Sequence, residues 1–245
     1  MNFDALHSKR IVITRPENQS VTLIDLLKRH GAVPLHVPLI EICPPSDNGD
    51  SLRREVANLD TFDWVVVTSA NGASAISGDL NRKNEKNRPQ IAAIGKATNK
   101  ALGSIADFVP SIARGDVLAS EFPIGSGRVL LVQAEHTDGV LATSLRLRGW
   151  NVIEVAAYQT RMVRPDPNAI ADAIDADALV LASGSAARSW VQSAGTHSPP
   201  IVVAIGQSTA AVSKSVGISI TQVTAEPTPV CVVETLANIF SLRHP

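Results

Sequence analysis

The sequence is poor in aromatic residues, in cysteine and in net charge. Aromatic residues make up 4% of its 245 residues, and 22 Lys and Arg oppose 23 Asp and Glu. Nucleic-acid-binding proteins use basic surfaces and aromatic side chains that stack on bases, so this composition argues against that class. No apolar run approaches the roughly 20 residues of a membrane helix, and the first residues lack the features of a signal peptide. We therefore expect a cytoplasmic protein that binds neither nucleic acid nor a membrane.

Motifs for metals, nucleotides and a serine nucleophile are missing as well. The two cysteines, Cys43 and Cys231, form neither a metal-binding spacing nor a disulfide framework. The six histidines contain no His-x-x-x-His pair, and no Walker A, Gly-x-Gly-x-x-Gly or Gly-x-Ser-x-Gly sequence occurs at a strand end. The sequence therefore predicts no metal site and argues against a nucleotide site.

An internal repeat organises the chain. Three segments occur twice, in the same order and at a spacing of about 115 residues. The matching pairs are 10–15 with 128–133, 63–71 with 177–185, and 91–98 with 202–209. The steady spacing indicates two copies of one structural unit.

Each copy alternates strand and helix patterns. Short apolar runs are typical of parallel strands that are buried on both faces; they lie at 11–13, 65–67, 129–132, 179–181 and 202–205. Amphipathic or Ala-rich segments that end at a glycine follow them, as expected of helices; they lie at 21–30, 98–103, 141–148 and 209–217. The fold class is predicted to be α/β, with two similar doubly wound parallel-sheet lobes.

Two topologies fit this pattern. One is a simple tandem pair of lobes. In the other, which we prefer, the equivalent extended segments 37–42 and 155–160 pair as a two-stranded β-ladder hinge, with a cleft between the lobes. The predicted boundaries are then 1–36 with 162–245 for a discontinuous first lobe, 44–154 for an inserted second lobe, and 37–43 and 155–161 for the hinge strands.

The turns that follow the strands carry the candidate binding residues. A helix N-terminus offers unpaired backbone N–H groups that attract anions, and Ser or Thr adds hydroxyl donors. The alternative is that each Ser or Thr only caps its own helix, that Lys96 is exposed charge, and that Arg15 pairs with Glu17 or Glu41. Repetition in both lobes favours a large ligand with several anionic groups, bound by Thr14, Arg15, Ser69, Asn71, Lys96, Thr98, Ser183, Ser185, Gly206, Ser208 and Thr209.

Five motifs in order resemble the uroporphyrinogen-III synthase family. They are IVITRP at 11–16, DWVVVTSANG at 63–72, IAAIGKAT at 91–98, VAAYQT at 155–160 and AIGQST at 204–209. Each motif is degenerate, but the ordered set is fairly specific and extends from Arg10 to about Leu236. The family also has two α/β lobes joined by a two-strand ladder.

The resemblance implies a lyase that closes hydroxymethylbilane, a linear tetrapyrrole rich in carboxylates, to uroporphyrinogen III. Closure would invert ring D and release water, in the pathway to haem, with no metal or organic cofactor. A monomer is expected, and a transient contact with the preceding enzyme of the pathway is left open. Tyr158 matches the family tyrosine that is proposed to assist departure of the ring A hydroxyl. From spacing alone, its ring could equally well pack the hinge.

The sequence departs from the family at two turns. Ala182 precedes Ser183 where the family has Thr-Ser, and Gln133-Ala134-Glu135-His136 stands where many members carry Arg-Gly. An anion-binding sensor or carrier without turnover would share the cleft and the helix N-termini, and stays an alternative. A sugar-phosphate isomerase or synthase is a weaker one, because the turns offer hydroxyls rather than a Glu or His base.

Overall fold

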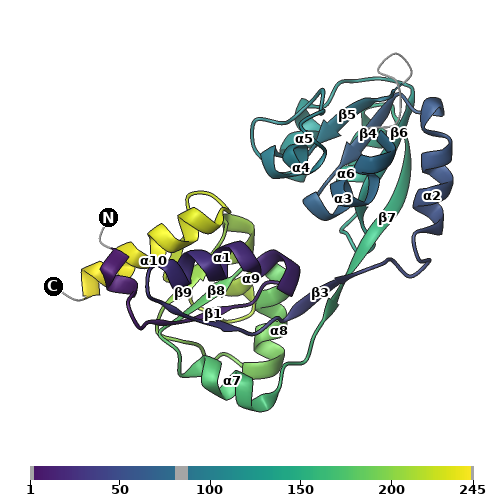
Figure 1. The fold of residues 1–245 in the computed structure, drawn as a ribbon. Helices are drawn as coiled ribbons and strands as arrows, with labels where there is room; N and C mark the ends of the chain where they lie inside the picture. Colours follow the sequence, from purple (N-terminus) through teal and green to yellow (C-terminus); the bar gives the residue numbers. More distant parts are fainter. Residues whose placement is uncertain (1–2, 81–87, 244–245) are drawn as a thin grey trace. The chain divides into compact units, whose positions relative to one another are not determined.

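The computed structural model describes residues 3–80 and 88–243 (Figure 1). The chain divides into two compact units, which we call unit 1 (Met1–Glu41 with Arg161–Pro245) and unit 2 (Ile42–Thr160). Each unit is built on a five-stranded sheet with helices on both faces. The prediction of an α/β fold with two parallel sheets is confirmed.

The sheet of unit 1 has the strand order β10-β9-β8-β1-β2, and every neighbouring pair is parallel. Its strands are β1 (Arg10–Ile13), β2 (Val33–His36), β8 (Ala178–Leu181), β9 (Val202–Ala204) and β10 (Gln222–Val223). The central strands β1, β8 and β9 are apolar and buried because helices cover both faces. Since β1 lies between β8 and β2, the simple tandem pair is excluded.

Two helical layers cover this sheet. On one face lie η1 (Phe3–Leu6), α1 (Glu17–Arg29) and α10 (Pro229–Arg243); α1 and α10 pack side by side (Figure 1). On the other face lie α7 (Pro167–Ile174) and α8 (Gly184–Ala194), and α8 packs on α9 (Gln207–Ser215). Trp190 of α8 is fully buried there, and its indole N–H donates to the carbonyl of His197 at 2.8 Å.

Unit 2 has the strand order β3-β7-β6-β4-β5. Its strands are β3 (Ile40–Cys43), β4 (Trp64–Val67), β5 (Gln90–Ala93), β6 (Arg128–Ala134) and β7 (Asn151–Met162). Its helices are α2 (Asp50–Ala57), η2 (Leu59–Thr61), α3 (Ala70–Leu80), α4 (Lys96–Ala101), α5 (Gly115–Glu121) and α6 (Val140–Leu147). The face under α5 and α6 contains edge-to-face aromatic contacts among Trp64, Phe108, Phe122 and Trp150.

The boundaries of several elements differ from those predicted. The segment 37–42 is a strand only from Ile40, because Pro38 has no N–H to continue a ladder. Its neighbour in the sheet is β7, and the division between the units falls inside these two strands. The helices predicted to begin at Thr98 and Thr209 begin two residues earlier, at Lys96 and Gln207. Within the described residues, no helix is long and apolar enough to cross a membrane.

Candidate functional site

The predicted site residues fall in two groups, and all of them except Tyr158, which lies within β7, follow the carboxyl ends of parallel strands. In unit 1, strands β1, β8 and β9 lead into α1, α8 and α9; in unit 2, β4 and β5 lead into α3 and α4. Turns after parallel strands share one edge of the sheet, which is where α/β proteins bind ligands. Unit 1 carries Thr14, Arg15, Ser183, Ser185, Gly206, Ser208 and Thr209, and unit 2 carries Ser69, Asn71, Lys96, Thr98 and Tyr158.

Three of the predicted hydroxyls are buried in their own unit. Thr14, Thr98 and Thr209 are 0%, 3% and 6% exposed. The Thr14 hydroxyl donates to the carbonyl of Val180 at 2.8 Å and so joins the end of β1 to β8. The side chains of these three residues therefore lie in the interior of their units.

Ser69 and Ser183 cap helices at equivalent places in the two units. The Ser69 Oγ accepts the N–H of Gly72 at 3.0 Å, and the Ser183 Oγ accepts that of Ala186 at 3.1 Å. The capping interpretation is therefore confirmed for both. A capping hydroxyl only accepts through its oxygen, so its hydrogen is still able to donate to a ligand.

Backbone donors are open at the starts of α8 and α9. The first intrahelical bonds run from Ala187 N to Ser183 O and from Ala210 N to Gly206 O, so the N–H groups before them have no carbonyl partner within the helix. Gly206 is extended, and the space beside its Cα is open. Ser208 is exposed, and Ser185 is half-buried. In unit 2, Lys96 is exposed and Asn71 is half-buried.

Arg15 has a half-buried side chain in the turn between β1 and α1. Among the described residues its guanidinium has neither a hydrogen bond nor an ion pair, and Glu41 pairs with Arg161 instead. Burial lowers the pKa of Arg15 from its ordinary value, although an Arg remains charged at neutral pH. A half-buried cation without a partner is suited to an anionic ligand.

Tyr158 belongs to unit 2. It lies on β7 opposite Ala134 of β6, just after an irregularity in the pairing of these strands. Its carbonyl accepts the N–H of Glu135 at 2.8 Å. The side chain is half-buried, and in the described part of the chain its phenol has no hydrogen-bond partner.

The turn after β6, where this sequence departs from the family, is occupied by contacts within unit 2. The Gln133 amide donates to Glu154 at 2.9 Å, and the Glu135 carboxylate accepts from the backbone and the hydroxyl of Ser46. Gln133, Glu135 and Glu154 border a cavity of about 300 Å³. Its walls supply carboxylates, so it does not suit an anionic group.

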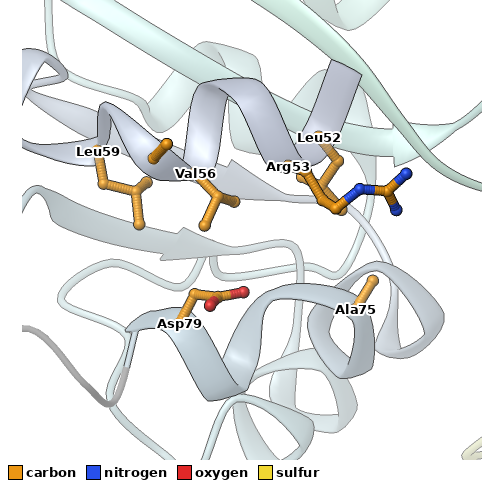
Figure 2. Close-up of a pocket in the computed structure, with 7 residues that line it drawn as sticks. Leu52, Arg53, Val56, Leu59, Ala75 and Asp79 are labelled. Carbon is orange, nitrogen blue, oxygen red and sulfur yellow. The ribbon is translucent and has the colours of Figure 1, made fainter. Parts of the chain in front are cut away.

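A larger pocket of about 480 Å³ lies between α2 and α3 (Figure 2). Leu52 and Val56 face Ala75 and Asp79 across it, and Arg53 is already paired with Asp50. None of the predicted site residues lines this pocket. The described residues also contain no group of His, Cys, Asp or Glu that could hold a metal ion.

Sequence reasoning missed two residues that contact the Arg15 turn. Ser20 of α1 is fully buried, and His36 ends β2; both lie within hydrogen-bond distance of the Arg15 carbonyl. The pairing of Ile13 with His36 brings β2 to this turn. A histidine at a strand end carries no motif, so only the register reveals the contact.

Comparison with known proteins gives consistent results. The family model described as "Uroporphyrinogen-III synthase HemD" matches residues 21–233. The porphyrin biosynthesis protein HemD of Ruminiclostridium josui is 30% identical over 69% of this chain, and the match spans only 35% of that protein. The chloroplastic uroporphyrinogen-III synthase of Oryza sativa subsp. japonica is 28% identical over 85% of this chain and 73% of its own.

A solved structure shows the same fold. A mutant uroporphyrinogen III synthase of the extremely thermophilic bacterium Thermus thermophilus aligns with a TM-score of 0.70 and 17% identity, over 97% of this chain and all of that one. At this identity the likeness concerns the fold alone.

Proposed function

Because the chain belongs to the uroporphyrinogen-III synthase family, we propose that it cyclises hydroxymethylbilane to uroporphyrinogen III in porphyrin biosynthesis. The reaction inverts ring D and releases water. The family match over residues 21–233 carries the proposal. The donors at the carboxyl ends of the two sheets support it, because the substrate is rich in carboxylates.

In this proposal the substrate carboxylates bind to three kinds of donor. The open N–H groups of α8 and α9 supply backbone donors. Ser69 and Ser183 can add a hydroxyl hydrogen while they cap their helices, and Arg15 supplies a guanidinium that has no partner within residues 3–80 and 88–243. Backbone donors bind anions without a basic surface, which is consistent with a formal net charge of −1.

The chemistry begins with the loss of the hydroxyl group from ring A. Hydroxide is a poor leaving group, so its departure needs assistance. A phenol at Tyr158 can donate a hydrogen bond or a proton as the C–O bond breaks. The resulting azafulvene is attacked by the substituted carbon of ring D, which forms a spiro intermediate. Fragmentation and reclosure at the other position of ring D complete the inversion. The proposal uses no metal and no organic cofactor.

The direct test is incubation with freshly made hydroxymethylbilane, followed by isomer analysis of the oxidised product. Uncatalysed closure gives uroporphyrinogen I, so isomer III in excess of a protein-free control is the expected result. Formation of isomer I alone, at the uncatalysed rate, would contradict the proposal.

A carrier that binds the same class of molecule without turnover is the second candidate. The half-buried Arg15 and the open helix N-termini would serve binding alone equally well. Saturable binding of a polycarboxylate tetrapyrrole, measured by fluorescence, without formation of isomer III would favour the carrier.

A further inference from the structure

The Arg15 turn is held by hydrogen bonds to each of its carbonyls. Val37 N donates to Ile13 O at 3.0 Å, and Leu39 N lies 3.4 Å from Thr14 O. On the other side, the Thr14 hydroxyl donates to β8. The backbone on the N-terminal side of Arg15 is therefore held by the segment that follows β2 and by β8.

Ser20 and His36 hold the carbonyls on the C-terminal side. The His36 Nε2 lies 2.9 Å from Arg15 O and 3.1 Å from the Ser20 Oγ. The Ser20 Oγ lies 2.9 Å from Pro16 O and 3.1 Å from Arg15 O. Ser20 is fully buried and so is its bond to Pro16 O, whereas the two contacts of His36 are part-buried.

Hydrogen-bond chemistry assigns the donors. A carbonyl oxygen only accepts, so Nε2 of His36 must carry a hydrogen to bond Arg15 O. The single hydroxyl hydrogen of Ser20 is then free for Pro16 O, which is its nearer carbonyl. In this arrangement both carbonyls have a side-chain donor of their own.

The fixed backbone of this turn orients the Arg15 side chain. Pro16 has a φ of −51°, which its ring constrains, and the Arg15 carbonyl is held by His36. The direction in which the side chain leaves the turn is thereby set, while the guanidinium itself has no partner among the residues of the described chain. A charged side chain that is oriented in advance loses less entropy when it binds.

We propose that His36 is a positioning residue for the substrate: its donation to the Arg15 carbonyl, supported by Ser20, holds the guanidinium ready for a substrate carboxylate. The inference rests on the proposed function, because it needs a carboxylate ligand. His36 acts through Arg15 and does not itself contact the substrate.

The experiment measures isomer III formation by the full chain at varied hydroxymethylbilane concentration. His36→Leu removes the donor and should raise KM about 3- to 10-fold, as expected for one lost hydrogen bond, with little change in kcat. His36→Gln offers an amide N–H at a similar reach and should restore much of the lost affinity. The matched control is His197→Leu, an exposed histidine of unit 1 away from the turn, which should leave KM unchanged.

A double-mutant cycle separates positioning from a general structural role. If His36 acts through Arg15, adding His36→Leu to Arg15→Ala should raise KM no further. An equal rise in both backgrounds would overturn the proposal, and so would an unchanged KM in His36→Leu alone.

Two controls keep the outcome decisive. If circular dichroism shows that His36→Leu does not fold, Ser20→Ala replaces it in the cycle, with the same expected loss of its effect beside Arg15→Ala. Wild-type protein that forms no isomer III would defeat the proposed function, and this inference with it. Active wild-type protein with an unaffected His36→Leu would defeat this inference alone.

Discussion

The two units share one arrangement of strands. Equivalent strands, identified by the sequence repeat, appear in the same spatial order: β9-β8-β1-β2 in unit 1 and β5-β4-β6-β7 in unit 2. The similarity extends to one edge of each sheet. In unit 1, β10 pairs with β9, and in unit 2 the single residue Phe108 forms a parallel bridge to Ala92 of β5, the equivalent of β9. The cores of the two copies therefore preserved their topology.

The units differ at equivalent turns. After β1, unit 1 has Arg15, whose guanidinium has no partner among the residues that the structure describes. After β6, unit 2 has Glu135, whose carboxylate accepts hydrogen bonds from Ser46. The phenol of Tyr158, unpaired in the described chain, belongs to unit 2. A buried strand tolerates few substitutions, whereas a turn at the sheet edge can change without disturbing the core. The proposed function therefore assigns the candidate cation to unit 1 and the candidate acid to unit 2, a division of labour that the variants below test.

The largest expected effect tests the contribution of unit 2. Tyr158→Phe keeps the ring and removes the donor, so isomer III should form more slowly by roughly 10²–10⁴-fold, the usual range for a positioned acid. The effect should fall on kcat, with stability unchanged in a thermal melt. A kcat near that of the wild type would show that Tyr158 only packs the strand, and that shaping of the substrate provides the catalysis.

The next prediction asks whether the two cores are independent. Trp190→Ala in unit 1 should cost about 3–5 kcal/mol of stability, because it leaves a large cavity. The equivalent position in unit 2 is Ile76, which is also fully buried, and Ile76→Ala should cost about 2–5 kcal/mol.

Urea unfolding can assign each loss to its unit. In Trp190→Ala the remaining tryptophans, Trp64 and Trp150, both lie in unit 2. Fluorescence should then report an unchanged transition, while circular dichroism shows an additional transition at lower urea. Coincident transitions by both methods would mean that the units unfold together.

Arg15→Ala is expected to have an intermediate effect. Loss of a charge-assisted hydrogen bond should weaken substrate binding by about 1–3 kcal/mol, seen as a raised KM. Arg188→Ala, which removes an exposed charge from α8 of the same unit, is the control and should leave KM unchanged. Complete inactivity of folded Arg15→Ala would make Arg15 catalytic and contradict the division of labour.

The smallest expected effect concerns the equivalent helix caps of the two units. Ser69→Ala and Ser183→Ala should each cost about 1 kcal/mol of stability, because both remove an N-cap. Ser183→Thr keeps the capping oxygen and should cost less. A raised KM in either folded alanine variant would show that the hydroxyl hydrogen also binds substrate. Clearly unequal losses of stability in the two variants would contradict the equivalence of the two caps.

Much of the fold could be predicted from local patterns. Buried parallel strands read as short apolar runs and helices as segments that end at glycine, and the repeat showed that the pattern occurs twice. The start of β3 near Pro38 was harder to predict. A proline interrupts the hydrogen bonding of a strand, but the sequence does not show at which residue the pairing begins again.

The candidate site was less predictable, because residue type does not reveal burial. Thr14 and Ser69 are both hydroxyl residues close to a strand end, yet Thr14 is fully buried on Val180 and Ser69 caps a helix. Their difference depends on which strand lies alongside, and a neighbouring strand can come from a distant part of the chain.

The sequence by itself determined the elements, the repeat and the set of turns, because apolar periodicity and helix-ending glycines act over a few residues. Only the tertiary structure decided which of those turns keep free donors. The parallel register of β1 and β2 brings His36 to Arg15, and the pairing of β1 with β8 buries Thr14. Such contacts join residues far apart in the chain, so they are set by the packing of whole strands and leave no local signal.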